Sequence, residues 1–402
     1  MIQQTRLTEE FLELTSLPSL SRREGQMARR LEAILKGMGA SVEVDDAGER
    51  VGGETGNLFA RFAGTVPGAP PFLLSGHMDT VGPAERIRTV RDGDIVRTDG
   101  TSVLGGDDKA GLVAILEAIR VVRERGIPHG DVEVVFTICE EQGLLGARHF
   151  DTARLRARRG LVLDVDGVAE LVVRAPAANR MTFTVHGLEA HAGICPERGL
   201  SAIQIAAEAI AGMRLGRLDA ETTANIGVIR GGLAGNIVPA QAVVHGETRS
   251  LDVARLEEQT AHMRRRFEDA VAAGRVTLGG REHRARLEVK VERQYDVLDV
   301  PETAGVVQLT LAGARAAGHA CPPRSTGGGS DANVFAARGL EVANLACGMR
   351  DIHTVNEWVD LRDLVTTTAI LVETLRLNAA QRPGSEAVGG SGGERRLAHP
   401  PA

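Results

Sequence analysis

The order of strand and helix patterns in this 402-residue chain predicts an α/β protein whose main domain has a mostly parallel sheet flanked by helices. Three observations support this fold class. Apolar strand patterns alternate with amphipathic helix patterns up to about residue 176, and again after Pro301. Between these stretches the order changes to βαββαβ, which indicates an inserted domain. Histidines and acidic residues also follow the ends of several predicted strands.

The first part of the main domain is predicted from its hydrophobic periodicity. Ser21 could cap the second helix, in which Met27, Leu31 and Leu35 fall on one apolar face. Helices are expected at 8–16, 22–39, 109–125 and about 144–157. Strands are expected at 58–62, 71–75, 132–138 and 160–165. Because strands and helices alternate, the strands should be mostly parallel, with helices on both faces of the sheet.

The segment 177–294 is predicted to form the inserted domain, with the βαββαβ order of a ferredoxin-like fold. Its strands are expected at 180–186, 223–229, 240–249 and 285–293, and its helices at 200–213 and 253–273. The main domain would then consist of residues 1–176 and 295–380, the second part with helices at 302–317, 331–338 and 361–380 and a strand at 341–346. Residues 381–402 are rich in Gly, Ser and Pro and are expected to be disordered.

Composition and charge argue against several classes of protein. The chain is 43% hydrophobic and 25% charged, which is typical of a globular protein. Its net charge of −6 argues against a nucleic-acid-binding protein. The four cysteines have no CxxC spacing, which indicates reduced thiols rather than disulfides or a thiolate zinc site. Because we find no membrane-spanning apolar run and no secretory pattern in Met1–Glu10, we expect a cytoplasmic protein that does not bind membranes.

The stretch Thr98–Gly111, TDGTSVLGGDDKAG, contains the residue around which a site is predicted to form. Gly105 and Gly106 allow a sharp backbone turn that would place Asp107 at a strand–helix junction, where ligands bind in α/β folds. In isolation, such a stretch would more often be a solvated turn that caps a helix. Clusters elsewhere in the chain favour Asp107 as the centre of a site instead.

These clusters follow the ends of predicted strands. In chain order their members are His77, Asp79, Glu140, Glu141, Asp164, Asp166 and His353. Each residue alone has an ordinary structural explanation, such as a solvated loop or a turn. Because the carboxyl ends of parallel strands meet at one edge of a sheet, we expect these side chains to lie close together.

Two histidines and several carboxylates form a ligand set that suits zinc, and that manganese or cobalt could also occupy. The number of ligands is too high for one zinc ion. Two ions about 3.5–4 Å apart, bridged by one carboxylate and a water, fit the set better. In the His77-Met78-Asp79 spacing, His77 is expected to bind metal while Asp79 hydrogen-bonds the other imidazole nitrogen.

These motifs resemble those of the dinuclear zinc peptidases that include tripeptidase T, carboxypeptidase G and the aminoacylase-type deacetylases. The similarity extends from about residue 8 to 378. In the family's order, the chain contains SGHMDTV, TDGTSVLGGDDKAG, CEEQGLLGA, VDG, the His191-Ala192-Gly193 stretch and HTVNEWV. GGDDKAG and the short loops are most similar to the tripeptidase-T branch.

The resemblance implies a role for each residue of the predicted metal centre. It implies two Zn²⁺ per chain, one held by His77, Asp107 and Asp166 and the other by Asp107, Glu141 and His353. Asp107 would bridge the ions, Glu140 would be the general base, and Asp79 would orient His77. Asp166 is preferred over Asp164 because the Asp166-Gly167 step matches the family's Asp-Gly step.

The resemblance also implies that the inserted domain is a lid that forms a homodimer. His191 of one chain would then reach the oxyanion in the site of the other. Gly328 lies in the turn 326–331, which resembles the family's Gly-Gly-Thr-Asp segment near the substrate. The extra glycine in this turn could alter that wall of the site.

Arg249, helped by Asn236, is predicted to hold the substrate's carboxylate. The family resemblance points to both positions, and a guanidinium binds a carboxylate through two parallel hydrogen bonds. The alternative is that Arg249 pairs with Glu247 or Asp252 on the surface, where such a pair would contribute little to stability.

The predicted activity is zinc-dependent hydrolysis of amide bonds in short peptides, with aminopeptidase-like cleavage. Glu140 would take a proton from the metal-bridged water and give it to the leaving amine. An N-acyl-amino-acid deacylase would use the same centre and is the alternative enzyme. A binding protein that has lost the chemistry is the alternative from another class, although an intact Glu140 argues against it.

Overall fold

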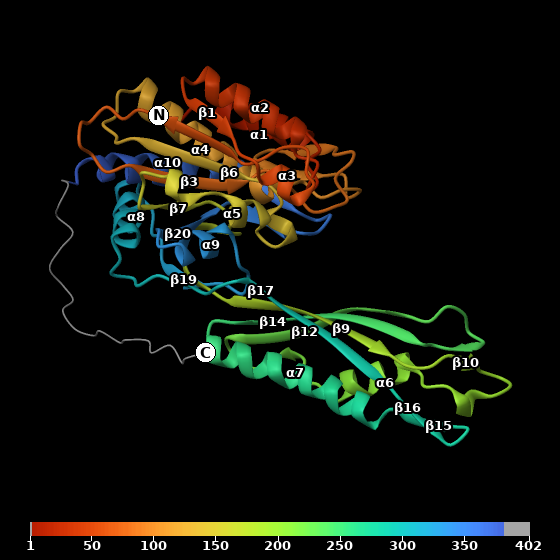
Figure 1. Ribbon diagram of the computed structural model, residues 1–402. Helices are drawn as coiled ribbons and strands as arrows, with labels where there is room; N and C mark the ends of the chain where they lie inside the picture. The colour runs from red at the N-terminus through yellow and green to blue at the C-terminus, as the bar shows by residue number, and fades with distance from the viewer. Residues whose placement is uncertain (1, 382–402) are drawn as a thin grey trace, which may run out of the picture.

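The computed structural model describes residues 2–381, which form a main domain and an elongated inserted domain (Figure 1). The main domain has a mixed sheet with helices packed around it, which confirms the predicted α/β class. The order of its strands is β1 (Ser41–Val44), β2 (Leu58–Phe62), β6 (Val132–Thr137), β3 (Phe72–His77), β7 (Arg159–Val162), β20 (Glu341–Cys347), β8 (Val168–Ala175) and β18 (Leu298–Asp299). β19 (Pro323–Ser325) also pairs with β8.

The centre of this sheet is parallel and the flanking pairs are antiparallel. β6, β3, β7 and β20 run in the same direction, whereas β2 and β8 are antiparallel to their inner neighbours. β3 and β6 are buried along their full lengths, as expected for strands covered on both faces. Because His77 pairs with Thr137 in the register of these strands, the two strands end at the same level.

The main helices pack in two groups. In one group α1 (Gln4–Ser16), α4 (Gly106–Glu124), α10 (Leu361–Ala379) and α8 (Gly305–Ala316) lie side by side. In the other, α5 (Leu145–His149) contacts α3 (Ala47–Val51) and α9 (Asp331–Ala337). α2 (Gly25–Gly37) packs against β1 and β2. One continuous apolar core joins these helices to the sheet.

The inserted domain has its own sheet and its own core. Its main strands are β9 (Ala177–His186), β12 (Thr222–Gly231), β14 (Gln241–Ser250) and β17 (Arg286–Tyr295), and its helices are α6 (Ala202–Ala211) and α7 (Val253–Ala273). The strands lie in the antiparallel order β12-β14-β9-β17, with short β11 (Gly216–Arg217) beside β12. Phe183 and Phe267 stack at 4.1 Å within an apolar cluster separate from that of the main domain.

Several elements differ from their predicted forms. The predicted helix at 144–157 is much shorter, because α5 ends at His149 and a separate 3-10 turn forms at Thr152–Arg154. α2 begins at Gly25, and the Ser21 hydroxyl donates to Asp79 instead of capping a helix. β8 was not predicted. A small sheet of β4 (Thr89–Asp92), β5 (Ile95–Thr98), β21 (Met349–Arg350) and β22 (Trp358–Asp360) was also missed.

Two expectations about the chain concern its tail and membranes. The predicted disordered tail, 381–402, lies outside the described residues except for its first residue. Within residues 2–381, no helix combines the length and the apolar character needed to cross a bilayer.

Candidate metal centre and substrate cavity

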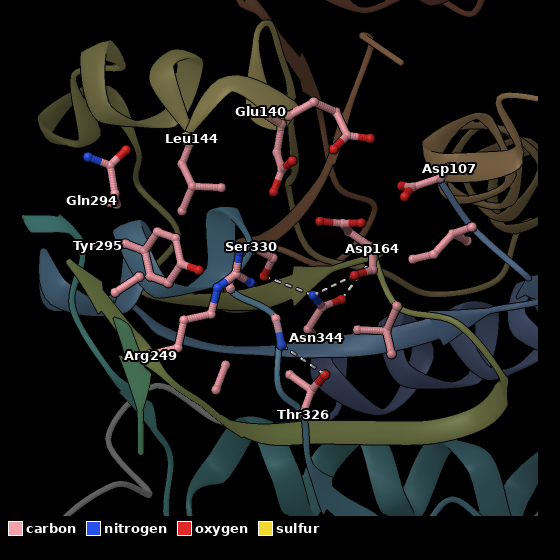
Figure 2. A pocket seen from close by; sticks show the side chains of 18 of the residues that line it. Asp107, Glu140, Leu144, Asp164, Arg249, Gln294, Tyr295, Thr326, Ser330 and Asn344 are labelled. Atoms are coloured by element: carbon pink, nitrogen blue, oxygen red, sulfur yellow. Dashed lines mark hydrogen bonds between the residues drawn. The ribbon is translucent and has the colours of Figure 1, made fainter. Parts of the chain in front are cut away.

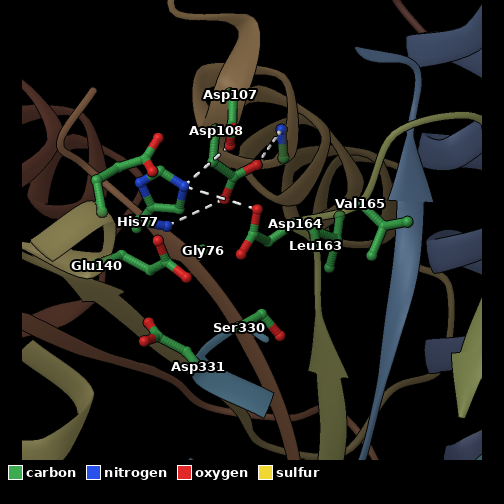
Figure 3. A network of polar contacts seen from close by, with 12 residues as sticks. Gly76, His77, Asp107, Asp108, Glu140, Leu163, Asp164, Val165, Ser330 and Asp331 are labelled. Carbon is green, nitrogen blue, oxygen red and sulfur yellow. Dashed lines mark hydrogen bonds and ion pairs between the residues drawn. The ribbon is translucent and has the colours of Figure 1, made fainter. Parts of the chain in front are cut away.

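Polar side chains converge at the C-terminal edge of the parallel strands (Figure 3). β3 ends at His77, and Glu140 follows the end of β6. Asp164 follows β7, and His353 lies in the loop after β21. Asp107 is in the first turn of α4. The sheet therefore brings together residues that are up to 276 positions apart in the sequence (353 − 77).

Asp107 lies between the two histidines of this cluster. Its Oδ1 is 3.0 Å from His77 Nε2, and its Oδ2 is 3.2 Å from His353 Nε2. Burial alone would raise the pKa of Asp107, but hydrogen bonds from His353 and His77 outweigh burial and hold its pKa below the ordinary value. An ionised carboxylate with one oxygen toward each histidine has the arrangement of a bridging ligand.

Each histidine also faces a second carboxylate. His77 Nε2 is 3.7 Å from Asp164 Oδ1, and His353 Nε2 is 2.9 Å from Glu141 Oε1. Hydrogen bonds to Asp107 and Glu141 raise the pKa of His353 to about 10. Burial would lower the pKa of His77, but its carboxylate neighbours, Asp107 first, raise it well above the ordinary value. Both histidines thus lie in a strongly anionic environment that favours a bound cation.

The prediction that Asp166 is the metal ligand beside His77 was wrong, because the structure places Asp164 there instead. The Asp166 side chain is 57% exposed, and its carboxylate is 3.0 Å from Arg324. Asp164 is only 11% exposed, and burial raises its pKa to about 7. The physical reason is a backbone bridge between Asp166 and Met349 that holds this segment beside β21, with the Asp166 carboxylate on Arg324 instead of on the cluster.

The donor set fits a pair of divalent cations. The ligand atoms of His77, Asp107 and Glu141 lie within 4.8 Å of one another, and so do those of His77, Glu140 and Asp164. Imidazole nitrogens and carboxylate oxygens suit zinc, cobalt and manganese. Glu141 Oε1 is buried and has no hydrogen bond of good geometry within residues 2–381, although His353 Nε2 is 2.9 Å away. An ion between these two atoms would satisfy both of them.

Asp79 connects the His77 ring to the turn that follows β6. The His77 Nδ1 atom is 2.9 Å from the Asp79 carbonyl oxygen and 3.4 Å from Asp79 Oδ1. The Asp79 carboxylate accepts hydrogen bonds from the Ser21 hydroxyl at 2.6 Å and from the backbone N–H groups of Glu140 and Glu141 at 2.9 and 3.2 Å. One buried carboxylate therefore orients both a histidine and the Glu140–Glu141 turn.

A sharp bend lets the adjacent Glu140 and Glu141 face one site. Cys139 has a φ of 50°, and the next three residues form a 3-10 turn. Glu141 then faces His353, while Glu140 lies near Asp164 at the cavity (Figure 3). Burial, followed by the charge of Asp164, raises the pKa of Glu140 well above its ordinary value. A carboxylate whose pKa is raised is a stronger base toward a proton of water.

A cavity of about 380 Å³ lies between this cluster and the inserted domain (Figure 2). Asp107 and Asp164 line one side, and Arg249 and Tyr295 line the side that belongs to the inserted domain (Figure 2). Gly328 also lines the cavity. The Arg249 guanidinium makes two contacts with the Glu247 carboxylate, at 3.0 and 3.2 Å, which is one of the alternative pairings considered for this arginine.

Comparison with known proteins identifies the family. The model of peptidase family M20/M25/M40 matches residues 73–377. The chain belongs to this family. YqjE, an uncharacterized protein of Bacillus subtilis, is 40% identical over 373 residues, which cover 92% of this chain and 98% of YqjE.

Two solved structures superpose over nearly the whole chain. The aminopeptidase PepT from Bacillus cereus has 38% sequence identity and a TM-score of 0.82, over 94% of this chain and 100% of that chain. A tripeptidase from Staphylococcus aureus has 35% identity and a TM-score of 0.86, over 95% of this chain and 100% of that chain. These similarities confirm the resemblance to the tripeptidase-T-like branch and support peptide hydrolysis as the activity.

In this M20/M25/M40 peptidase, two predicted substrate-binding residues lie away from the cavity. His191 belongs to β10 (Ala190–His191), which pairs with β13 (Ile237–Val238) at the end of the inserted domain remote from the main domain (Figure 1). Asn236 is next to this pair, and its carbonyl oxygen accepts the Ala192 N–H at 2.9 Å. His191 and Asn236 are therefore close to each other, and neither is among the described residues that line the cavity with Arg249.

Sequence reasoning missed two acidic residues that accept hydrogen bonds from the backbone beside the predicted ligands. Asp108 Oδ2 accepts the backbone N–H of His77 at 3.0 Å, and a Cβ on Gly76 would come within 2.4 Å of that oxygen. Glu357 accepts hydrogen bonds from the backbone of the Asp107 turn. Both residues lie inside motifs that carry the family resemblance, GGDDKAG and HTVNEWV, but their hydrogen bonds to backbone N–H groups leave no signal in the sequence.

Proposed function

We propose that this chain is a dinuclear metallopeptidase that releases N-terminal residues from short peptides, with zinc as the metal and cobalt or manganese as substitutes. The observation that carries the proposal is the position of Asp107, which offers one oxygen to each of two histidines beside a cavity that Glu140 lines. The names of the similar structures, an aminopeptidase and a tripeptidase, support the choice of substrate class.

The ligands divide between two ions that share Asp107. One ion would be held by His77, Asp107 and Asp164, and the other by Asp107, Glu141 and His353. When bound, the two ions would lower the pKa of a water molecule and polarise the scissile carbonyl group. Asp79 keeps the His77 ring oriented with its Nε2 atom toward Asp107 and Asp164.

Glu140 is the proposed general base. It would take the proton of the attacking water and return it to the leaving amine. Its backbone N–H donates to Asp79, which holds this carboxyl group at the wall of the cavity. Burial, followed by the charge of Asp164, raises the pKa of Glu140, which makes its carboxylate a stronger base toward the proton of the water.

Arg249, with Asn236, is proposed to hold the carboxylate of the substrate. The guanidinium lies in the cavity, and a substrate carboxylate would have to replace Glu247 as its partner. Asn236 lies beside His191, away from the cavity of its own chain, and would reach this substrate only from the inserted domain of a second chain. Gly328, on the opposite loop, leaves room for the substrate at this wall because it has no side chain.

His191 is proposed to act in the site of a second chain, in a homodimer formed through the inserted domains. Its exposed ring, remote from the cavity of its own chain, is consistent with this role. Inactive His191→Ala and Glu140→Gln chains should partly restore activity when mixed, because one site of each heterodimer would be intact. Absence of recovery after verified subunit exchange would contradict a shared site.

The proposed function can be tested with protein loaded with zinc or cobalt and a panel of dipeptides, tripeptides and N-acetyl amino acids. We expect release of the N-terminal amino acid from the peptides, loss of this activity in chelator, and recovery when metal is returned. Cleavage of N-acetyl amino acids alone would instead identify an N-acyl-amino-acid deacylase. Peptide binding without any turnover would identify a binding protein.

A further inference from the structure

Glu357 is a buried carboxylate whose two oxygens are both used on one short segment of backbone. It is 1% exposed. Its Oε2 accepts the N–H of Gly105 at 2.8 Å, and its Oε1 accepts the N–H of Asp107 at 2.8 Å. Hydrogen bonds from N–H groups to an ionised carboxylate are stronger than those between neutral groups. Glu357 therefore holds both ends of the turn that presents Asp107.

This turn needs an external support because two of its residues are glycines. Gly105 has a φ of 69°, and a Cβ at Gly106 would come within 3.0 Å of Glu357 Oε1 and 2.8 Å of the Val359 side chain. Glycine permits this close approach, but it also gives the turn much conformational freedom. A bridging carboxylate must keep its two oxygens in fixed positions, so this freedom would weaken metal binding.

Glu357 also lies close in the chain to His353, so it connects the turn that contains Asp107 with the loop that contains this second predicted ligand. Glu357 is four residues after His353 (357 − 353), and it immediately precedes β22, which pairs with both β21 and β5. Lys109, in the same helix as Asp107, is buried near Glu357, and its Nζ donates to the Leu17 carbonyl oxygen at 2.9 Å. The loop with His353 and the turn with Asp107 are thereby fixed relative to each other.

We propose that Glu357 is a positioning residue that sets the geometry between the bridging carboxylate of Asp107 and the imidazole of His353, and thereby the affinity for metal. This inference rests on the proposed dinuclear centre. Residues that orient metal ligands typically change metal affinity by about 10–100-fold when they are replaced. Glu357→Gln should show an effect of this size, because an amide nitrogen cannot accept the second backbone N–H.

Glu133 offers a matched control within the same domain. It is also 1% exposed, and its Oε2 accepts two backbone N–H groups, those of Arg156 and Ala157, at 2.9 Å each. It lies in β6 four residues before Thr137, which pairs with His77, and its Oε1 accepts Arg61 Nε at 3.1 Å. Glu133→Gln should therefore lower the thermal stability of the metal-free protein, as Glu357→Gln does, without a change in zinc affinity.

Calorimetric titration of the metal-free chains with Zn²⁺ tests the proposal without the use of activity. We expect two zinc ions per wild-type and Glu133→Gln chain, and about 10–100-fold weaker binding to Glu357→Gln. Equal affinities in all three would overturn the proposal, as would an equal loss in both variants. If Glu357→Gln does not fold, Glu357→Asp, which keeps the charge but is too short to reach both N–H groups, should show the loss. A wild-type chain that binds no zinc would instead refute the proposed function.

A second inference concerns Arg180, which lines the cavity from β9. Among residues 2–381, its exposed guanidinium makes no hydrogen bond or ion pair, whereas Arg249 is held by Glu247. Arg249 is opposite Ala178 in the sheet, and Arg180 is two residues further from the main domain, opposite Glu247. Two residues of a strand span about 7 Å, which is also the length that about two more residues add to an extended peptide.

We infer that Arg180 binds the C-terminal carboxylate of peptides that are longer than those bound by Arg249, so that it sets the preferred substrate length. This role also rests on the proposed function. Arg180→Gln should lower kcat/KM about tenfold for the longer of a dipeptide-to-tetrapeptide series, as expected when one charge-assisted contact is lost. Dipeptides and C-terminally amidated peptides should be unaffected.

Arg230→Gln provides the control, because Arg230 is an exposed arginine of β12 that is not among the described residues lining the cavity. An equal loss of kcat/KM on all peptides, or no loss on any, would overturn the role of Arg180. A wild-type protein that cleaves no peptide of the series would refute the proposed function instead.

Discussion

The two walls of the cavity are built in different ways. On the main-domain wall, His77 and Asp107 are 2% and 5% exposed and are held at the ends of buried strands and helices. On the inserted-domain wall, the Arg249 side chain is 33% exposed and already has Glu247 as its partner. His191 and Asn236 are exposed and lie far from the cavity. The first wall can hold ions as it stands, whereas the second must rearrange, or receive residues from another chain, to hold a substrate.

This comparison predicts the largest effect for a change on the main-domain wall. Glu140→Gln should lower kcat by about 10²–10⁴-fold, because an amide cannot take the proton of the attacking water. The metal content should not change, since Glu141, His353 and Asp107 remain in place. Steady-state kinetics and metal analysis of the same preparation check both points. Activity within about tenfold of wild type would place the base elsewhere.

Asp164 and Asp166 provide a second test, because they are close in sequence and differ in environment. Asp164→Asn should weaken the binding of one zinc ion by at least about 10–100-fold, since its carboxylate faces His77. Asp166→Asn should bind both ions normally, since it removes only a contact with Arg324. Equilibrium dialysis of the two variants against zinc separates them. Normal metal content in Asp164→Asn, together with loss in Asp166→Asn, would restore the assignment made from the sequence.

A substitution on the inserted-domain wall should have a smaller effect on activity than one on the main-domain wall, and this effect should depend on the substrate. Arg249→Lys should lower kcat/KM by about tenfold on free-acid peptides, because a point charge cannot replace the two-point guanidinium contact. Amidated peptides should show no further loss with this variant. A comparison of kcat/KM on matched free and amidated peptides measures the difference. Equal losses on both would leave Arg249 with only its structural contact to Glu247.

The smallest expected effect is a change in the pH dependence of stability. Burial, followed by the charge of Asp107, raises the pKa of Glu357 from 4.5 to about 7. Between these values the folded protein binds more protons at this residue than the unfolded chain, so the contribution of Glu357 to the free energy of unfolding falls as pH rises. In metal-free Glu357→Gln, this decrease of the free energy of unfolding with rising pH should be absent. Urea unfolding at several pH values between about 4.5 and 7 measures it, and identical slopes would contradict the assignment.

The sequence predicts the fold well where local patterns and tertiary packing agree. The fully buried strands β3 and β6 and the amphipathic α10 lie close to their expected bounds. β8 was missed because Val168–Ala175 has no regular alternation of apolar and polar residues. The strands at 89–98 and 349–360 were missed because they are short and depend on each other through long-range pairing.

The sequence predicts which types of residue form the site better than it predicts which individual residues lie there. Asp164 and Asp166 are two residues apart, so a period of two gives both the same direction and cannot choose between them. Contacts with Met349 and Arg324, which are distant in the sequence, decide between the two. The positions of His191 and Asn236 depend on the placement of a whole domain, which local sequence does not encode. Glu357 was overlooked because its function is to accept backbone N–H groups, and these carry no sequence signal.

The central claim is that Asp107 bridges two metal ions. Anomalous diffraction from crystals of the zinc-loaded protein, recorded on both sides of the zinc absorption edge, tests this claim most directly. We predict two peaks about 3.5–4 Å apart on either side of the Asp107 carboxylate, one beside His77 and Asp164 and the other beside His353 and Glu141. A single peak, or two peaks that do not share Asp107, would contradict the account.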